Sequence, residues 1–194
     1  MPKQTPSQTV GPYFRIGLYS DNEVYPRLFT GELATPEVSG ERIRIEGTVY
    51  DGAGDPIPDC MLEVWQADSE GRYRTREGSW NDGFTGFGRV GTDEVGQYAI
   101  DTIMPGRVPG PNGGLQAPHI TMLVYMRGML LHAFTRIYFE DHAAANAEDP
   151  ILALVPEDRR ATLLAQRRPG KGPVALYRFD LQMQGDDETV FFDV

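Results

Sequence analysis

One segment decides the fold: Cys60-Met61-Leu62-Glu63-Val64-Trp65-Gln66. Successive side chains of a strand point to opposite faces of a sheet, so Leu62 and Val64 lie on one face and Trp65 on the other. A strand that is apolar on both faces fits the middle of a sheet better than its edge. We therefore predict a central strand here, with Trp65 in the core.

Further strands are predicted on both sides of this segment. Apolar and polar residues alternate from Arg42 to Val49, which is the period of a half-buried strand. Other strands are expected over residues 98–103, 120–126, 131–139 and 175–183. Arg127-Gly128 forms the expected turn of a hairpin in which the numbers of facing residues sum to about 257. Glycine and proline punctuate residues 67–90 and 105–118, which are predicted to be loops.

Two short helices are expected in the last third of the chain. Asp141 is a candidate N-cap for a helix through residues 143–145. Pro156-Glu157-Asp158 is typical of a helix start, and Arg167-Arg168 followed by Gly170 is typical of a helix end.

Composition supports a turn-rich β protein. Glycine and proline together make 37 of the 194 residues (22 plus 15). About seven short strands with minor helices predict an antiparallel β-sandwich, and the length fits a single domain over residues 1–194. Residues 1–12 contain Pro2, Pro6 and Pro12 among small polar residues, so we expect an extended arm that packs on a partner.

Charge and cysteine usage narrow the class of protein. The formal charge of −10 argues against binding to nucleic acid or to an anionic membrane surface, because both need a basic face. Cys60 is the only cysteine, and we expect it to be a small buried apolar residue in a reducing compartment. The polar N-terminus does not resemble a signal peptide, and no run approaches the ~20 apolar residues of a membrane span. These features predict a cytoplasmic protein.

Three motifs carry a resemblance to a known family. In chain order they are Gly71-Arg72-Tyr73-Arg74, Met104-Pro105-Gly106-Arg107-Val108 and Pro118-His119-Ile120-Thr121. Together with Thr5–Tyr13 and Glu188–Asp193, they resemble the intradiol ring-cleaving dioxygenases over nearly the whole chain. That resemblance implies a β-sandwich and, in catalytic members, a ferric ion held by two tyrosines and two histidines.

Two of the four ligand positions lack a metal-binding side chain. By resemblance they are Tyr73, Val108, His119 and Thr121, and Gln116 stands where catalytic relatives have an arginine. We therefore expect no iron site in this chain. Tyr73 and His119 should instead hydrogen-bond each other or nearby backbone.

The two remaining histidines are candidate substitute ligands. His132 should face Tyr125, six residues from His119 and thus about 20 Å away, so those two histidines cannot share an ion. We expect His132 on the sheet surface or in an interface. His142 lies beyond the strand and is left open.

The resemblance also implies a partner and a substrate. It implies that this chain is a non-iron-binding alpha subunit, inactive alone, and that a related beta chain carries Fe(III) in a higher-order assembly of αβ units. The implied reaction of aromatic catabolism, in the beta-ketoadipate pathway, cleaves protocatechuate with O2 between its hydroxyls to 3-carboxy-cis,cis-muconate. Arg127 would lie near the bound substrate, and Gly11, Pro12 and Tyr13 would approach the iron site of the partner. No residue of this chain is expected to be catalytic.

Three other interpretations stay open at the level of sequence. Arg127 can be an ordinary solvated turn residue. The chain can be a self-sufficient dioxygenase with unusual iron ligands. It can also be a β-sandwich binding or scaffold module without activity. The sequence has no phosphate-binding glycine loop and no Cys-x-x-Cys motif that would favour a nucleotide or zinc protein.

Overall fold

A computed structural model describes residues 11, 17–19, 27–74, 83–170 and 172–193. The strands are β1 (Arg42–Tyr50), β2 (Met61–Trp65), β3 (Phe87–Gly91), β4 (Gln97–Ile103), β5 (His119–Tyr125), β6 (Ala133–Phe139), β7 (Leu164–Arg168), β8 (Ala175–Arg178) and β9 (Leu181–Gln182). The helices are short: α2 (Ala143–Glu148) is α-helical, and the 3-10 helices are η1 (Pro111–Gly113), η2 (Glu140–His142), η3 (Leu152–Leu154) and η4 (Glu157–Leu163).

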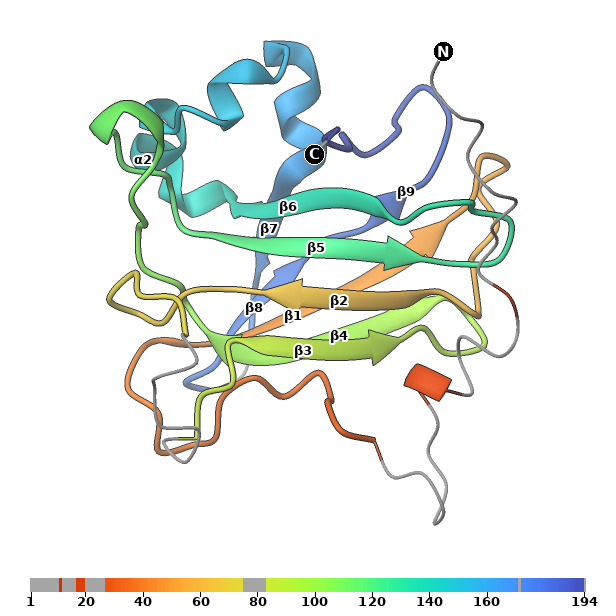
Figure 1. Ribbon diagram of the computed structural model, residues 1–194, viewed down its shortest axis with the longest axis horizontal. Helices are drawn as coiled ribbons and strands as arrows, with labels where there is room; N and C mark the ends of the chain where they lie inside the picture. The colour runs from red at the N-terminus through yellow and green to blue at the C-terminus, as the bar shows by residue number, and fades with distance from the viewer. Residues whose placement is uncertain (1–10, 12–16, 20–26, 75–82, 171, 194) are drawn as a thin grey trace, which may run out of the picture.

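Eight strands follow one hydrogen-bonded path, β3-β2-β5-β6-β7-β8-β1-β4, and β9 pairs with β1. Figure 1 shows this path folded into two layers, with β6, β5, β2 and β3 in front of β7, β8, β1 and β4. The core lies between the layers, because both supply fully buried side chains, among them Leu62, Ile120, Met122, Ile137, Ile43, Ile45, Ile100 and Tyr177. The predicted mainly β fold with short helices is confirmed. None of the described helices has the length and apolar character needed to cross a membrane.

The sheet is mixed, so the predicted antiparallel sandwich holds for most strand pairs but not for all of them. β1 runs parallel to β8 and to β9, and β6 runs parallel to β7. Residues 140–163 between β6 and β7 contain η2, α2, η3 and η4, which carry the chain back far enough for β7 to start beside β6 in the same direction. Alternation of apolar residues reports a strand and its buried face, but it does not report the direction of its neighbour.

β2 is central, as predicted, since it pairs with β3 on one side and with β5 on the other. Trp65, however, is 40% exposed, so its placement in the core was wrong. Its indole lies on the outer face of the front layer, 6.1 Å from the ring of Phe87 in an edge contact. The Leu62 and Val64 face of β2 enters the main core cluster, where both residues are buried.

Two strands were missed. β3 falls within a stretch predicted as loop because of its glycines, yet Gly88 is a point of close packing: a Cβ there would lie 2.5 Å from Cδ1 of Leu33. β7 includes Arg167 and Arg168, which were predicted to end a helix. That helix, η4, ends at Leu163 instead.

Asp141 does not cap a helix, which corrects another prediction. α2 begins after His142 without a side-chain cap. The Asp141 carboxylate accepts hydrogen bonds from Arg167 Nη1 at 2.8 Å and from the Tyr177 hydroxyl at 2.9 Å, so it ties η2 to β7 and β8. A charged guanidinium and a phenol stabilise this carboxylate more strongly than the one or two backbone N–H groups at the start of a helix would.

Candidate functional site

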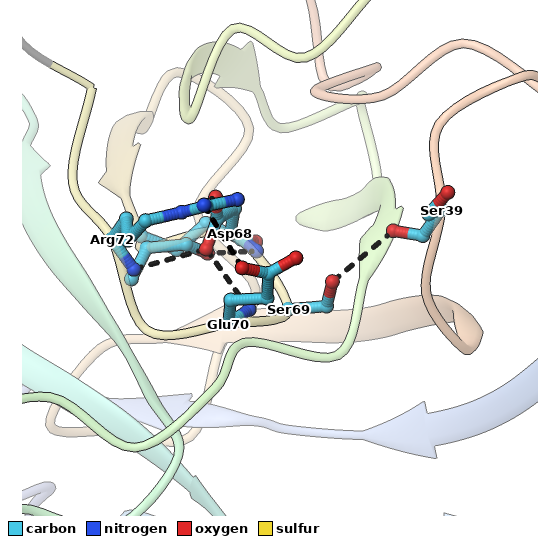
Figure 2. A network of polar contacts seen from close by, with 7 residues as sticks. Ser39, Asp68, Ser69, Glu70 and Arg72 are labelled. Atoms are coloured by element: carbon cyan, nitrogen blue, oxygen red, sulfur yellow. Dashed lines mark hydrogen bonds and ion pairs between the residues drawn. The ribbon is translucent and has the colours of Figure 1, made fainter.

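The first part of the site is the loop of residues 68–72, which precedes Tyr73 and is held by hydrogen bonds to Asp68. Figure 2 shows Asp68 at its centre, where Oδ1 accepts the backbone N–H of Glu70 and of Arg72, each at 2.9 Å. Oδ2 accepts Arg72 Nε, also at 2.9 Å. Ser69 Oγ donates to the carbonyl of Ser39 at 3.3 Å, which ties the loop to the segment before β1. One carboxylate thus closes residues 68–72 into a single turn.

This loop packs directly on the second motif. A Cβ on Gly71 would lie 2.0 Å from the carbonyl oxygen of Arg107, and Gly71 has a φ of 79°, so no other residue fits there. Gly106 donates its N–H to the Asp68 carbonyl at 2.8 Å. The backbone of the first two motifs therefore meets as the resemblance implies, and it delivers Tyr73 and Val108 to one region.

Tyr73 and His119 meet, as predicted: the Tyr73 hydroxyl lies 3.4 Å from Nε2 of His119. His119 Nδ1 donates to the Ala117 carbonyl at 2.8 Å, which leaves Nε2 of the neutral ring as the acceptor for the phenol. Burial, and then the positive charge of Arg136, lowers the pKa of His119 to about 4. Burial raises the pKa of Tyr73. At neutral pH the pair is a phenol beside an uncharged imidazole.

Arg136 is a site residue that the sequence analysis missed. It lies opposite Thr121 in the β5–β6 ladder, and its Nη1 donates to Gln116 Oε1 at 2.7 Å. Its Nη1 also lies 3.4 Å from the Tyr138 hydroxyl. The facing residues 121 and 136 sum to 257, the register predicted for the hairpin, so the signal for Arg136 was present in the sequence.

A buried carboxylate stands behind this cluster. Asp149 is fully buried and accepts the backbone N–H of Ala117 at 2.6 Å and those of Ile151 and Leu152 at 2.8 Å each. Because Ala117 also accepts from His119 Nδ1, Asp149 helps to fix the segment that orients the imidazole.

The donor set does not fit a ferric ion. Val108 is 2% exposed, and its side chain has no donor atom. Thr121 supplies only a neutral hydroxyl, and the guanidinium of Arg136 repels a cation. A hard trivalent ion needs several anionic oxygens. In the part of the chain that the structure describes, no group of three or more histidine, cysteine, aspartate or glutamate residues is arranged to hold a metal.

Neither remaining histidine completes the set. The ring of His132 is exposed and lies 5.6 Å from the ring of Tyr125, as the predicted register requires. His142 packs 6.1 Å from the ring of Phe139. Tyr138 precedes Phe139 in β6, and its ring lies 5.7 Å from the ring of His119. Neighbouring strand residues point to opposite faces, so His142 packs against the other face of β6.

Of the predicted substrate-binding residues, Arg127 lies beyond the opposite end of β5 from His119. Arg127 is in the loop between β5 and β6, where Gly128 has a φ of 88°, and its Nε donates to Oδ2 of Asp59. The Arg127 side chain is 70% exposed. Gly11 has open space where a side chain would begin. Pro12 and Tyr13 lie outside the described residues, as does most of the predicted arm.

The comparisons with known proteins agree with this geometry. The family model described as "Dioxygenase" matches residues 11–185. The dioxygenase domain of a dioxygenase carbohydrate-binding protein fusion from Streptomyces sp. SirexAA-E has a TM-score of 0.59 at 25% identity, covering 93% of this chain and 97% of that one. The chain belongs to the intradiol dioxygenase family.

Sequence similarity to individual members shows to which group within the family the chain belongs. The chain is 51% identical to the protocatechuate 3,4-dioxygenase alpha chain of Burkholderia cepacia, covering 99% of this chain and 98% of that protein. It is 32% identical to the beta chain of the same organism, covering 79% and 68% respectively. Within the family it therefore groups with the protocatechuate 3,4-dioxygenase alpha chains, which confirms the resemblance found in the sequence.

Proposed function

We propose that the chain is the non-iron-binding subunit of a protocatechuate 3,4-dioxygenase and works only with a beta chain that carries Fe(III). The αβ complex would cleave protocatechuate with O2 between its hydroxyls to 3-carboxy-cis,cis-muconate. The observation that carries this proposal is the donor set: Tyr73 and His119 pair with each other, buried Val108 has no donor atom at its ligand position, and Arg136 adds a positive charge near His119. Such a site cannot hold the ion that the reaction needs, so a partner must supply it.

The contribution of this chain would be recognition of the substrate. Protocatechuate carries a carboxylate, and a chain with a net charge of −10 presents it with an unfavourable average field. A locally placed arginine overcomes that field, because a guanidinium can bind a carboxylate through two parallel hydrogen bonds. Arg127, whose side chain is 70% exposed at the tip of the β5–β6 hairpin, would do so across an interface. The arm with Gly11, Pro12 and Tyr13 would complete the wall and exclude water.

Iron content and turnover, measured with and without a partner, test the proposal. The chain would be purified alone and co-expressed with a beta chain of the family, and each sample assayed for iron per chain and for oxidation of protocatechuate. We expect iron and turnover only in the complex. Stoichiometric iron with turnover in the isolated chain would establish a self-sufficient enzyme instead. A stable, monodisperse chain that binds no beta chain would point to a scaffold module.

A further inference from the structure

Arg127 is held by a specific partner whose position follows from the sheet. β2 and β5 are antiparallel with Met61 opposite Tyr125. Two residues beyond each strand end, the same register sets Asp59 against Arg127, and their side chains form an ion pair. The contact joins the tip of the β5–β6 hairpin to the turn that enters β2.

The turn that carries Asp59 is firmly anchored. The next residue, Cys60, is 2% exposed and donates its N–H to Thr92 Oγ1 at 3.0 Å. Thr92 Oγ1 in turn donates to the Ile57 carbonyl at 2.7 Å. Buried hydrogen bonds therefore fix the backbone on both sides of Asp59. Its own side chain is 19% exposed, so the carboxylate is a fixed point rather than a mobile surface charge.

The contact uses only one edge of the guanidinium. Nε of Arg127 donates to Oδ2 of Asp59, and no described residue accepts a hydrogen bond from either Nη of Arg127. A guanidinium presents five donors in a planar fork, so the edge formed by Nη1 and Nη2 stays open for a planar anion. We propose that Asp59 is a positioning residue that holds Arg127 with this edge free to bind the substrate carboxylate. This inference rests on the proposed function, since it assigns the carboxylate to a substrate at the interface.

Asp59 affects binding of the substrate carboxylate in two opposite ways, and we expect its orientation of Arg127 to outweigh its charge repulsion. Its negative charge repels the incoming carboxylate, but the two anions are separated by a guanidinium in an exposed place, where their repulsion is screened. An arginine without a partner must be immobilised when the ligand binds. Immobilising one long side chain weakens binding by about 2- to 12-fold.

Kinetics of the αβ complex distinguish these effects. Asp59→Ala should raise KM for protocatechuate by about 5-fold with kcat and iron content unchanged, because it removes the fixed acceptor of Nε. Asp59→Asn keeps an oxygen that can accept from Nε and should stay within about 2-fold of the wild type. In Arg127→Ala, the added Asp59→Ala change should not raise KM any further. Asp101→Ala is the matched control, because Asp101 and Arg44 are also a cross-strand ion pair but lie on β4 and β1.

Competitive inhibitors separate positioning from a merely structural role. Asp59→Ala should weaken inhibition by 4-hydroxybenzoate, which has the carboxylate, and leave inhibition by phenol unchanged. Equal losses of inhibition by the two compounds, or a lower KM in Asp59→Ala, overturn the inference.

The variants also separate this inference from the proposed function. If Arg127→Ala raises KM while Asp59→Ala does not, only the role of Asp59 fails and the proposed function stands. If Arg127→Ala has no effect on KM, the inference fails together with the assigned role of Arg127. Should the alanine variant not assemble, Asp59→Ser, which is too short to reach Nε, takes its place with the same expected results.

Discussion

Nε2 of His119 and the hydroxyl of Tyr73 lie 3.4 Å apart, although 46 residues separate them in the chain. Both residues stand at positions that hold iron in catalytic relatives, according to the resemblance. Here each supplies what the other lacks: the phenol donates and the imidazole accepts. Arg136 contributes a fixed positive charge to the same region, which favours the uncharged imidazole. We therefore expect this polar cluster to contribute to stability, so its protonation should affect the free energy of unfolding.

Stability should fall as the pH drops below about 6.5, the usual pKa of histidine. The pKa of His119 is lowered to about 4 in the folded chain, chiefly by burial, so between these values the unfolded chain binds the extra proton. Protonation of His119 in the unfolded chain should therefore lower the free energy of unfolding by about 2 kcal/mol at pH 5 relative to pH 7. Urea titrations at the two pH values measure this difference.

His119→Gln provides the control for that titration. It removes the titrating group while keeping an acceptor, so the loss of stability between pH 7 and pH 5 should shrink by most of that amount. An unchanged loss in the variant would assign the pH dependence to other groups.

The sequence predicted the strands that alternate and the hairpin that connects two of them. The register of about 257 was right, and it already set Arg136 opposite Thr121. What it could not show was where Arg136 points, because its contact with Gln116 depends on the 105–118 loop. The pair of Asp59 and Arg127 was equally hidden, since it follows from the register of β2 against β5, two segments about 60 residues apart.

Errors in the prediction share a physical cause. Gly88 was interpreted as a loop signal, whereas it makes room for Leu33 against a strand. Trp65 was placed in the core because it is large and apolar, whereas its face of β2 is turned outward. In both cases packing between segments that are distant in sequence decided the outcome, and local patterns carry little information about it.

Asp149 should be among the residues most important for stability. Asp149→Ala leaves three backbone N–H groups without an acceptor, two of them buried and one partly buried, and we expect a loss of about 3 to 5 kcal/mol in the free energy of unfolding. Asp149→Asn keeps one acceptor oxygen and should lose less. Denaturant unfolding measures both, with Asp186→Ala, at an exposed turn, as the control that should change by less than about 0.5 kcal/mol. A loss below about 1 kcal/mol in Asp149→Ala would contradict this account.

Cys60 should be chemically inert in the folded chain. It is 2% exposed, and burial, followed by the charge of Asp59, raises the pKa of its thiol. We expect a thiol reagent at pH 8 to label the native chain at least about 100-fold more slowly than the chain unfolded in urea, because reaction requires opening of the structure. Cys60→Ala gives the background rate. Equal labelling of the native and unfolded chains would show that the turn before β2 opens freely, and it would weaken the case for Asp59 as a fixed point.

Removal of residues 1–12 should impair the αβ complex while leaving the fold of this chain intact. The arm lacks the apolar periodicity that would pack it on its own domain, and its three prolines disfavour a helix or a central strand. We expect the truncated chain to keep the denaturant midpoint of the full chain but to bind the beta chain at least about 10-fold more weakly, or to turn over protocatechuate with a raised KM. Analytical ultracentrifugation and steady-state kinetics distinguish these two effects.

The matched control replaces residues 1–10 with a glycine-serine sequence of equal length, so that Gly11, Pro12 and Tyr13 remain. Full activity in that control but not in the truncation would assign the function to Gly11 and Pro12, since Tyr13 is present in both, whereas full activity in both would show that residues 1–12 have no part in the site.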